Sequence, residues 1–204
     1  MEDKRPIDRK RESGGYADVG SIEDGAIVEL LDISGKLIII KEKSIYEMIF
    51  ADKVDPNRTN INLPPTILKL VIDKGVESEI VSRTFLTAKT LFRREFFSSS
   101  INCDDILGLT VDMLSEISIL EKEIKGLVDD EDIVTHDFEI RRNQKVSYEI
   151  PSMVNLESRC KTVFQKADHI EQTLMEIIII IYPNDGLKKQ SHFPKFLEII
   201  KAKL

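Results

Sequence analysis

Three histidines are the side chains of this chain best suited to proton transfer or metal binding at neutral pH. His169 falls within a long helical pattern, where a second metal ligand would stand four residues away. Those two places hold Gln165 and Thr173, which are not the ligands that zinc prefers. His192 precedes a proline-containing segment, and we expect it to flank a helix. We therefore assign no catalytic role to either histidine.

The third histidine, His136, lies in an acidic run that offers the oxygen ligands used by hard cations. The run lacks the glycine and the alternating ligands of a calcium loop, and runs of carboxylates usually form a solvated surface. We therefore expect no metal site and no cofactor. The acids concerned are Asp129, Asp130, Glu131, Asp132 and Asp137.

Motifs for nucleophilic catalysis or phosphate binding are missing from the sequence. It contains no GxSxG, no CxxC and no glycine-rich phosphate loop. Its two cysteines, Cys103 and Cys160, lie far apart, and Cys160 occupies a position in a helical apolar pattern, which indicates packing rather than reactivity. We expect no catalytic residue and favour a protein that is not an enzyme.

A basic cluster, Arg141, Arg142 and Lys145, falls in a predicted turn and is a candidate contact for phosphate. Charged residues in turns are usually solvated, so a solvated turn is the simpler interpretation. The net charge of -7 and the aromatic content of 6%, without Trp, are unlike those of a nucleic-acid-binding domain. Composition therefore disfavours nucleic acid as a partner without excluding it.

Two long segments carry the strongest pattern in the chain, apolar residues spaced alternately by four and three. The pattern predicts helices over about 104–128 and 154–182, each with a seam that packs on another helix. The seam residues proposed as core or interface are Ile106, Met113, Ile117, Leu120, Ile124, Leu156, Val163, Ile170, Leu174 and Ile177.

The second of these helices becomes apolar all round at residues 177–181. Ile178, Ile179 and Ile180 point away from the seam and need other neighbours, because large contiguous apolar patches on a soluble protein generally mark an interface. These three residues are therefore a candidate patch for a partner.

The remaining segments predict short elements. Apolar runs on both sides of Gly35 predict a β-hairpin near 26–40, and alternation near 133–150 predicts a second one. A capping box at Ser44 predicts a short helix, and Pro64-Pro65 predict the start of another that ends near Gly75. Further helices are expected from about residue 77 and from 194 to 204.

The N-terminal 22 residues mix charges with glycine and offer little to bury, which predicts a flexible arm before a single helical domain over 23–204. The longest apolar run, 177–182, is far shorter than the ~20 residues that span a bilayer, and the N-terminus has no secretory apolar segment. We expect a soluble cytoplasmic protein with no membrane partner.

Together these patterns predict an α+β fold that is predominantly α: a helical bundle with two long heptad-patterned helices and one or two β-hairpins. They favour a non-enzymatic accessory subunit that docks through helix faces, with a protein partner or by self-association. One alternative is a nucleic-acid-acting enzyme or toxin whose site assembles in space around Arg141, Arg142 and His136. Another is a subunit of a coiled-coil ATPase complex in prokaryotic defence or chromosome maintenance. Whether the seams pack within one chain or between chains stays open.

Overall fold

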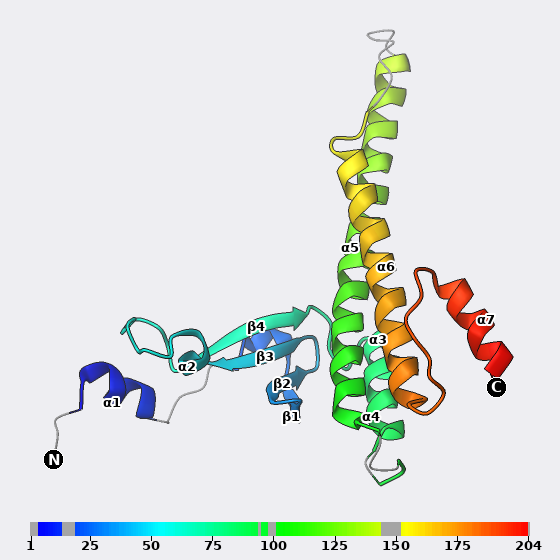
Figure 1. Ribbon diagram of the computed structural model, residues 1–204. Helices are drawn as coiled ribbons and strands as arrows, with labels where there is room; N and C mark the ends of the chain where they lie inside the picture. Colours follow the sequence, from blue (N-terminus) through cyan, green and yellow to red (C-terminus); the bar gives the residue numbers. More distant parts are fainter. Residues whose placement is uncertain (1–3, 14–18, 94, 98–100, 144–151, 204) are drawn as a thin grey trace. The chain divides into compact units, whose positions relative to one another are not determined.

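The computed structural model describes residues 4–13, 19–93, 95–97, 101–143 and 152–203. The chain divides into two compact units, Met1–Val111 and Asp112–Leu204. The first contains a four-stranded antiparallel sheet and the second is made of helices (Figure 1). The α+β fold and the two long helices packed together confirm the predicted fold class. The single domain over 23–204 stays a prediction.

The sheet is a meander in the order β1-β2-β3-β4, with every neighbouring pair antiparallel. The hairpin predicted near 26–40 is confirmed, and it turns at Ser34 and Gly35, which both have positive φ. Its apolar, β-branched runs suit a pleated surface that is covered by neighbours. The strands are β1 (Ile27–Ile33), β2 (Lys36–Lys41), β3 (Ile45–Phe50) and β4 (Thr66–Ile72).

The two helices predicted to start at Ser44 and at Pro64-Pro65 are wrong predictions, because strands β3 and β4 occupy those segments. Ser44 does not cap a helix; its backbone carbonyl accepts from the amide of Lys41 in the turn between β2 and β3. Residues 45–50 and 66–72 are rich in Ile, Leu, Val and Tyr, which favour strands once a neighbouring strand is present. Pairing across the sheet therefore outweighed the local helix signals.

A helical stretch follows the sheet, formed by α3 (Glu79–Val81), a π-helical turn (Ser82–Leu86) and α4 (Thr87–Leu91). It agrees with the helix predicted from about residue 77. Val81 and Phe85 on this stretch are fully buried, as are Ile39, Ile40 and Ile45 of the sheet. These side chains are among the most deeply buried of the first unit.

Short helices complete the first unit: α1 (Pro6–Glu12), η1 (Ile22–Asp24) and α2 (Ala51–Val54). Helix α1 lies within the N-terminal segment that was predicted to be a flexible arm. Ile7 of this helix is buried, and Arg11 lies 3.3 Å from an oxygen of Asp55. Residues 6–12 therefore pack on the loop that follows α2.

Helix α5 (Cys103–Asn143) runs from the first unit into the second, which also contains α6 (Leu156–Ile181) and α7 (Phe193–Lys203). The hairpin predicted near 133–150 is wrong over 133–143, which is helical; residues 144–151 lie outside the described part of the chain. The apolar residues that alternate there also fit a helix, since Val134 and Phe138 are four apart. The sequence has no Gly or Pro between Gly126 and Pro151 to end the helix earlier.

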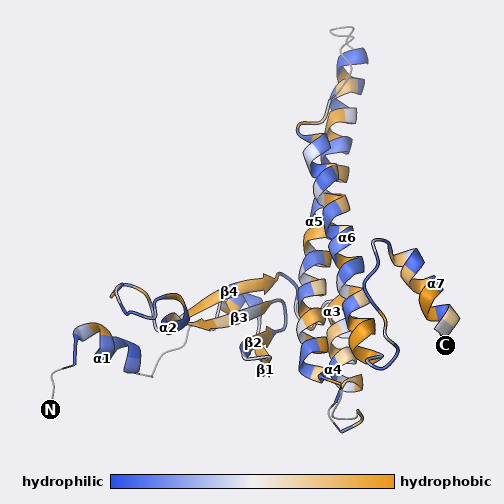
Figure 2. Cartoon of the chain, viewed as in Figure 1, coloured by the Kyte–Doolittle hydropathy of each residue, from blue (hydrophilic) through white to orange (hydrophobic). Residues whose placement is uncertain are grey.

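Apolar residues dominate the strands and the C-terminal end of α6, whereas the rest of α5 and α6 is mixed (Figure 2). Across the described residues, none of the helices is both long enough and apolar enough to span a bilayer. The mixed stretch is where the candidate site lies.

Candidate interaction surface

Helices α5 and α6 form an antiparallel hairpin that is linked by ion pairs. Lys166 Nζ lies 2.7 Å from Glu116 Oε2, and Arg159 Nε lies 3.8 Å from Glu123 Oε2. Arg159 also pairs with Asp130. The residues on α5 are spaced by seven, as are the two on α6, so these pairs occupy one side of the hairpin along several turns. We call this side the ion-paired flank.

Gly126 on α5 leaves space for the side chain of Arg159. A Cβ atom added at Gly126 would come within 2.7 Å of a terminal nitrogen of Arg159. Any larger side chain at this position would require the Arg159 guanidinium to move, and with it the contacts to Glu123 and Asp130. Gly126 therefore allows the arginine to lie across α5.

The opposite side of the hairpin carries a group of apolar side chains. Ile124 and Cys160 follow the paired residues Glu123 and Arg159 by one position, and Val128 and Phe164 follow them by five. Five residues correspond to a rotation of about 140° on a helix. In an antiparallel pair, equal offsets along both helices turn to the same side. We call this side the apolar flank, and it comprises Ile117, Ile124, Val128, Leu156, Cys160 and Phe164.

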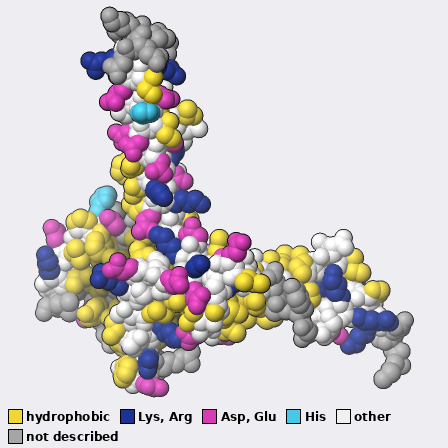
Figure 3. Space-filling view, turned by 180° about the vertical axis from the view of Figure 1, so that it is seen from behind, with side chains coloured by type: hydrophobic (Ala, Val, Ile, Leu, Met, Phe, Trp, Pro, Cys, Tyr) yellow, Lys and Arg dark blue, Asp and Glu magenta, His cyan; other side chains and the backbone are white. Residues whose placement is uncertain are grey.

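The apolar flank is open to solvent. Phe164 is 73% exposed, and Val128, Ile124 and Leu156 are 50%, 45% and 44% exposed, while Ile117 and Cys160 are half-buried. Large apolar side chains that are exposed singly are ordinary, but these share one side of two paired helices. Apolar and charged side chains alternate along the helical hairpin in a space-filling view from behind (Figure 3).

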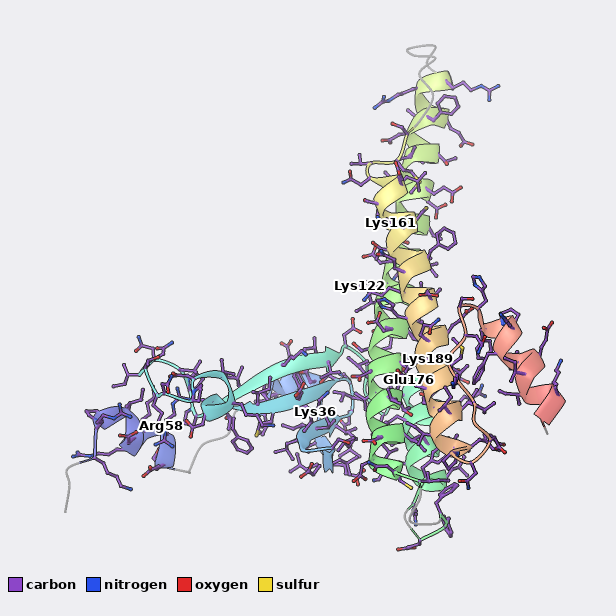
Figure 4. The ribbon with its side chains drawn as sticks, viewed as in Figure 1. Lys36, Arg58, Lys122, Lys161, Glu176 and Lys189 are labelled. Atoms are coloured by element: carbon purple, nitrogen blue, oxygen red, sulfur yellow. The ribbon has the colours of Figure 1, made fainter. Side chains whose placement is uncertain are left out.

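Phe164 stands in a shallow, open hollow along α6. Its lining combines the aromatic ring with charged and polar side chains, and Lys161 from this lining is labelled on α6 in Figure 4. Such a surface can accept an apolar side chain at its centre and polar groups at its rim. The lining residues are Glu157, Cys160, Lys161, Phe164, Gln165, Asp168 and His169.

The predicted seam is covered at one end of the hairpin and open at the other. Ile106 and Ile177 are buried, whereas Ile124 and Leu156 are exposed. The candidate patch of Ile178, Ile179 and Ile180 is half-buried in the chain itself. The intermediate seam residues, all half-buried, are Met113, Ile117, Leu120, Val163, Ile170 and Leu174.

Sequence reasoning missed Phe164 and Val128, because each lies directly beside a seam position rather than on it. The signal that could have revealed Phe164 is the pair Val163-Phe164. One helix seam cannot bury two consecutive large apolar residues, so one of them must face elsewhere.

The candidates for catalysis do not come together in a cleft. Arg141 and Arg142 are exposed on the last turn of α5, and Lys145 lies outside the described residues. His136 is also exposed, and the acids of the neighbouring run point around the helix in several directions. Within the described segments, no three His, Cys, Asp or Glu side chains are grouped closely enough to hold a metal ion.

The densest group of charges in the first unit has a structural role. Arg58 pairs with Asp8 at 3.1 Å, Glu12 at 3.2 Å and Asp52 at 2.8 Å (Figure 4). Hydrogen bonds from Arg5 and then from Arg58 lower the pKa of Asp8 to about 2, although partial burial opposes the shift. The same carboxylates raise the pKa of Arg58. Each charge is matched, so the group fastens α1 to the loop after α2.

Among the described residues, the apolar flank combines exposed apolar side chains with charged residues at its margin. Protein interfaces commonly have the same composition. Comparisons with protein-family models, with curated proteins and with solved structures found no match to this chain.

Proposed function

We propose that this protein is a non-enzymatic accessory subunit that docks a helix of another protein on the apolar flank. The observation that carries the proposal is the 73% exposure of Phe164 on the same side of the hairpin as the exposed side chains of Ile124, Val128 and Leu156. Aromatic side chains that lie at the centre of an interface commonly supply much of its binding energy. Covering one such side chain contributes roughly 1.5–3 kcal/mol.

The shape of the flank favours a helical ligand. It extends from Ile117 to Val128 along α5, about 16 Å or three helical turns. A third helix laid beside an antiparallel pair completes the packing seen in helical bundles, where apolar stripes from several helices meet. A subunit of a coiled-coil ATPase complex would use this surface in the same way, because such partners present long helices.

A photoreactive benzoyl-phenylalanine at position 164 tests the proposal in cells that naturally express the protein. We expect a crosslinked partner from position 164 and none from position 119. Ile119 is the matched control, since it is apolar and 38% exposed but lies three residues after Glu116, towards the ion-paired flank.

The partner identified in this way is then purified for calorimetry. Phe164→Ser should weaken its binding at least about tenfold, whereas Ile119→Ser should change it less than about twofold. The stability of both variants should stay within about 0.5 kcal/mol of the parent, as for other surface substitutions. Equal crosslinking from both positions, no crosslink at 164, or unchanged binding of Phe164→Ser would contradict the proposal.

A further inference from the structure

Carboxylates occupy the same helical stripes as the apolar flank. Glu157 and Glu171 stand seven residues before and after Phe164 on α6. On α5, Glu121 stands seven residues before Val128, and Glu131 stands seven after Ile124. A spacing of seven returns to nearly the same side of a helix, so all four carboxylates border the apolar residues, and all four are exposed.

Basic residues are fewer around the flank and lie farther out. Lys125 and Lys161 each follow a flank carboxylate by four residues, Glu121 and Glu157 respectively. The four carboxylates and these two lysines sum to a charge of -2, and Asp168 in the hollow at Phe164 adds a further negative charge. The whole chain has the same sign, with a net charge of -7. The field at the flank is therefore negative.

We infer that the occupant of the apolar flank is a basic amphipathic helix of another protein, an inference that rests on the proposed function. Its apolar stripe covers Phe164 and Ile124, and its Lys or Arg residues on either side of that stripe face the carboxylates. Opposite charges at the rim of an interface accelerate association and exclude wrong partners. A second copy of this chain is the weaker candidate, because a symmetric pair would bring two sets of four carboxylates together.

The positions of the carboxylates set the length of this helix. Glu157 and Glu171 are fourteen residues apart on α6, about 21 Å at the rise of an α-helix. A partner that reaches both must present about 15 helical residues or more. Its apolar residues should recur at alternating spacings of three and four, with basic residues immediately beside them.

Two designed helical peptides of about 18 residues test the inference by fluorescence anisotropy with the full chain. Both carry the same Leu and Ala stripe; one has Lys and Arg beside the stripe, and the other has Glu. We expect the basic peptide to bind at least about tenfold more tightly, and the difference to shrink in about 0.5 M salt.

Two triple variants with equal changes in charge show where the selectivity arises. One is Glu121→Gln, Glu157→Gln and Glu171→Gln on the flank. The other is Asp112→Asn, Asp137→Asn and Glu198→Gln, at exposed positions off the flank. The first should abolish most of the preference for the basic peptide, and the second should preserve it.

Each alternative result has a distinct meaning. Equal binding of both peptides that is lost in Phe164→Ser would overturn the charge preference and leave the docking surface standing. Equal effects of the two triple variants would also overturn the inference, because the attraction would then come from the whole chain. If neither peptide binds, both the inference and the docking surface are contradicted. If the chain instead associates with itself through Phe164, the occupant is a second copy and the inference of a helix from another protein is contradicted.

Discussion

Strand β2 and the C-terminal part of α6 each carry a run of isoleucines, but the chain covers them to different extents. Ile38, Ile39 and Ile40 of β2 are 3%, 0% and 0% exposed. Within the run on α6, Ile177 is buried and residues 178–181 are half-buried. A central strand has a neighbour at each edge and side chains against both faces, whereas a paired helix covers one stripe and leaves the rest of its circumference for other partners.

The same contrast explains the apolar flank. Two helices can bury the residues between them, and the ion pairs from Arg159 and Lys166 cover one side of that contact. Phe164 and Val128 lie on the other side. Strands β1 and β3 flank β2, but no other element of the described hairpin covers these two side chains. A region that is closed by its own neighbours supports the fold, and a region left open can support binding.

The largest effect is expected in the sheet. Ile40→Asp would bury a carboxylate without a partner and should cost about 4 kcal/mol or more of unfolding free energy. Leu30→Asp, on edge strand β1 where Leu30 is 56% exposed, should cost about 0.5 kcal/mol. Urea unfolding followed by circular dichroism measures both. Similar losses of unfolding free energy in the two variants would mean that β2 is no better buried than edge strand β1.

Helix α7 offers a comparison within the second unit. Phe196 is fully buried and stacks on Phe193 with ring centroids 6.3 Å apart, whereas Leu197 beside it is exposed. Phe196→Ala should cost about 3 kcal/mol by undocking α7, and Leu197→Ala less than about 1 kcal/mol. Hydrogen exchange of α7 amides reports the undocking. Unchanged protection in Phe196→Ala would contradict the packing of α7.

A smaller effect is expected on the ion-paired flank. Arg159→Met removes the pairs with Glu123 and Asp130, whose carboxylates are partly solvated, so the loss should be about 0.5–1 kcal/mol and should shrink at high salt. Arg83→Met is the control, because Arg83 and Glu79 form a pair that is more than 70% exposed. A larger loss for Arg83→Met, measured by urea unfolding, would show that the hairpin pairs do not align α5 and α6.

The smallest effect concerns α1 and is set by pH. The folded pKa of Asp8, about 2, lies below its ordinary value of 3.8, so the stabilisation is complete above the ordinary pKa and is lost as pH falls through the folded value. We expect amide protection in α1 to persist at pH 5 and to fall between about pH 4 and 2. Asp8→Asn should weaken protection at pH 5 and remove part of this pH dependence. An identical acid profile in the variant would show that Asp8 is not the responsible group.

Patterns that repeat over many residues were predictable, and isolated local signals were not. The heptad spacing in α5 and α6 and the hairpin at Gly35 appear in the structure. The helix predicted from the capping box at Ser44 was wrong, because strand pairing with β2 outweighs one capping interaction. The strand predicted from the alternation around Phe138 was wrong, because a short charged stretch fits the strand and helix periods equally.

The apolar flank could be predicted only in part. Its seam members Ile117, Ile124 and Leu156 were identified from spacing, but their exposure depends on how α5 and α6 rotate against each other. That rotation is linked to contacts such as Glu123 with Arg159, which are 36 residues apart and invisible to a local pattern. The exposure of Phe164 follows from the same long-range alignment.

The two cysteines provide the most direct measurement of the central claim, that the apolar flank is open while the rest of the core is closed. Cys103 is 3% exposed at the start of α5, and Cys160 lies half-buried on the flank. With an aromatic disulfide reagent, we expect one thiol per chain to react rapidly, peptide mapping to place it at Cys160, and Cys103 to react only on unfolding. The basic peptide should slow the reaction at Cys160. If Cys160 is as protected as Cys103, or if the bound peptide leaves its rate unchanged, the apolar flank is not the docking surface.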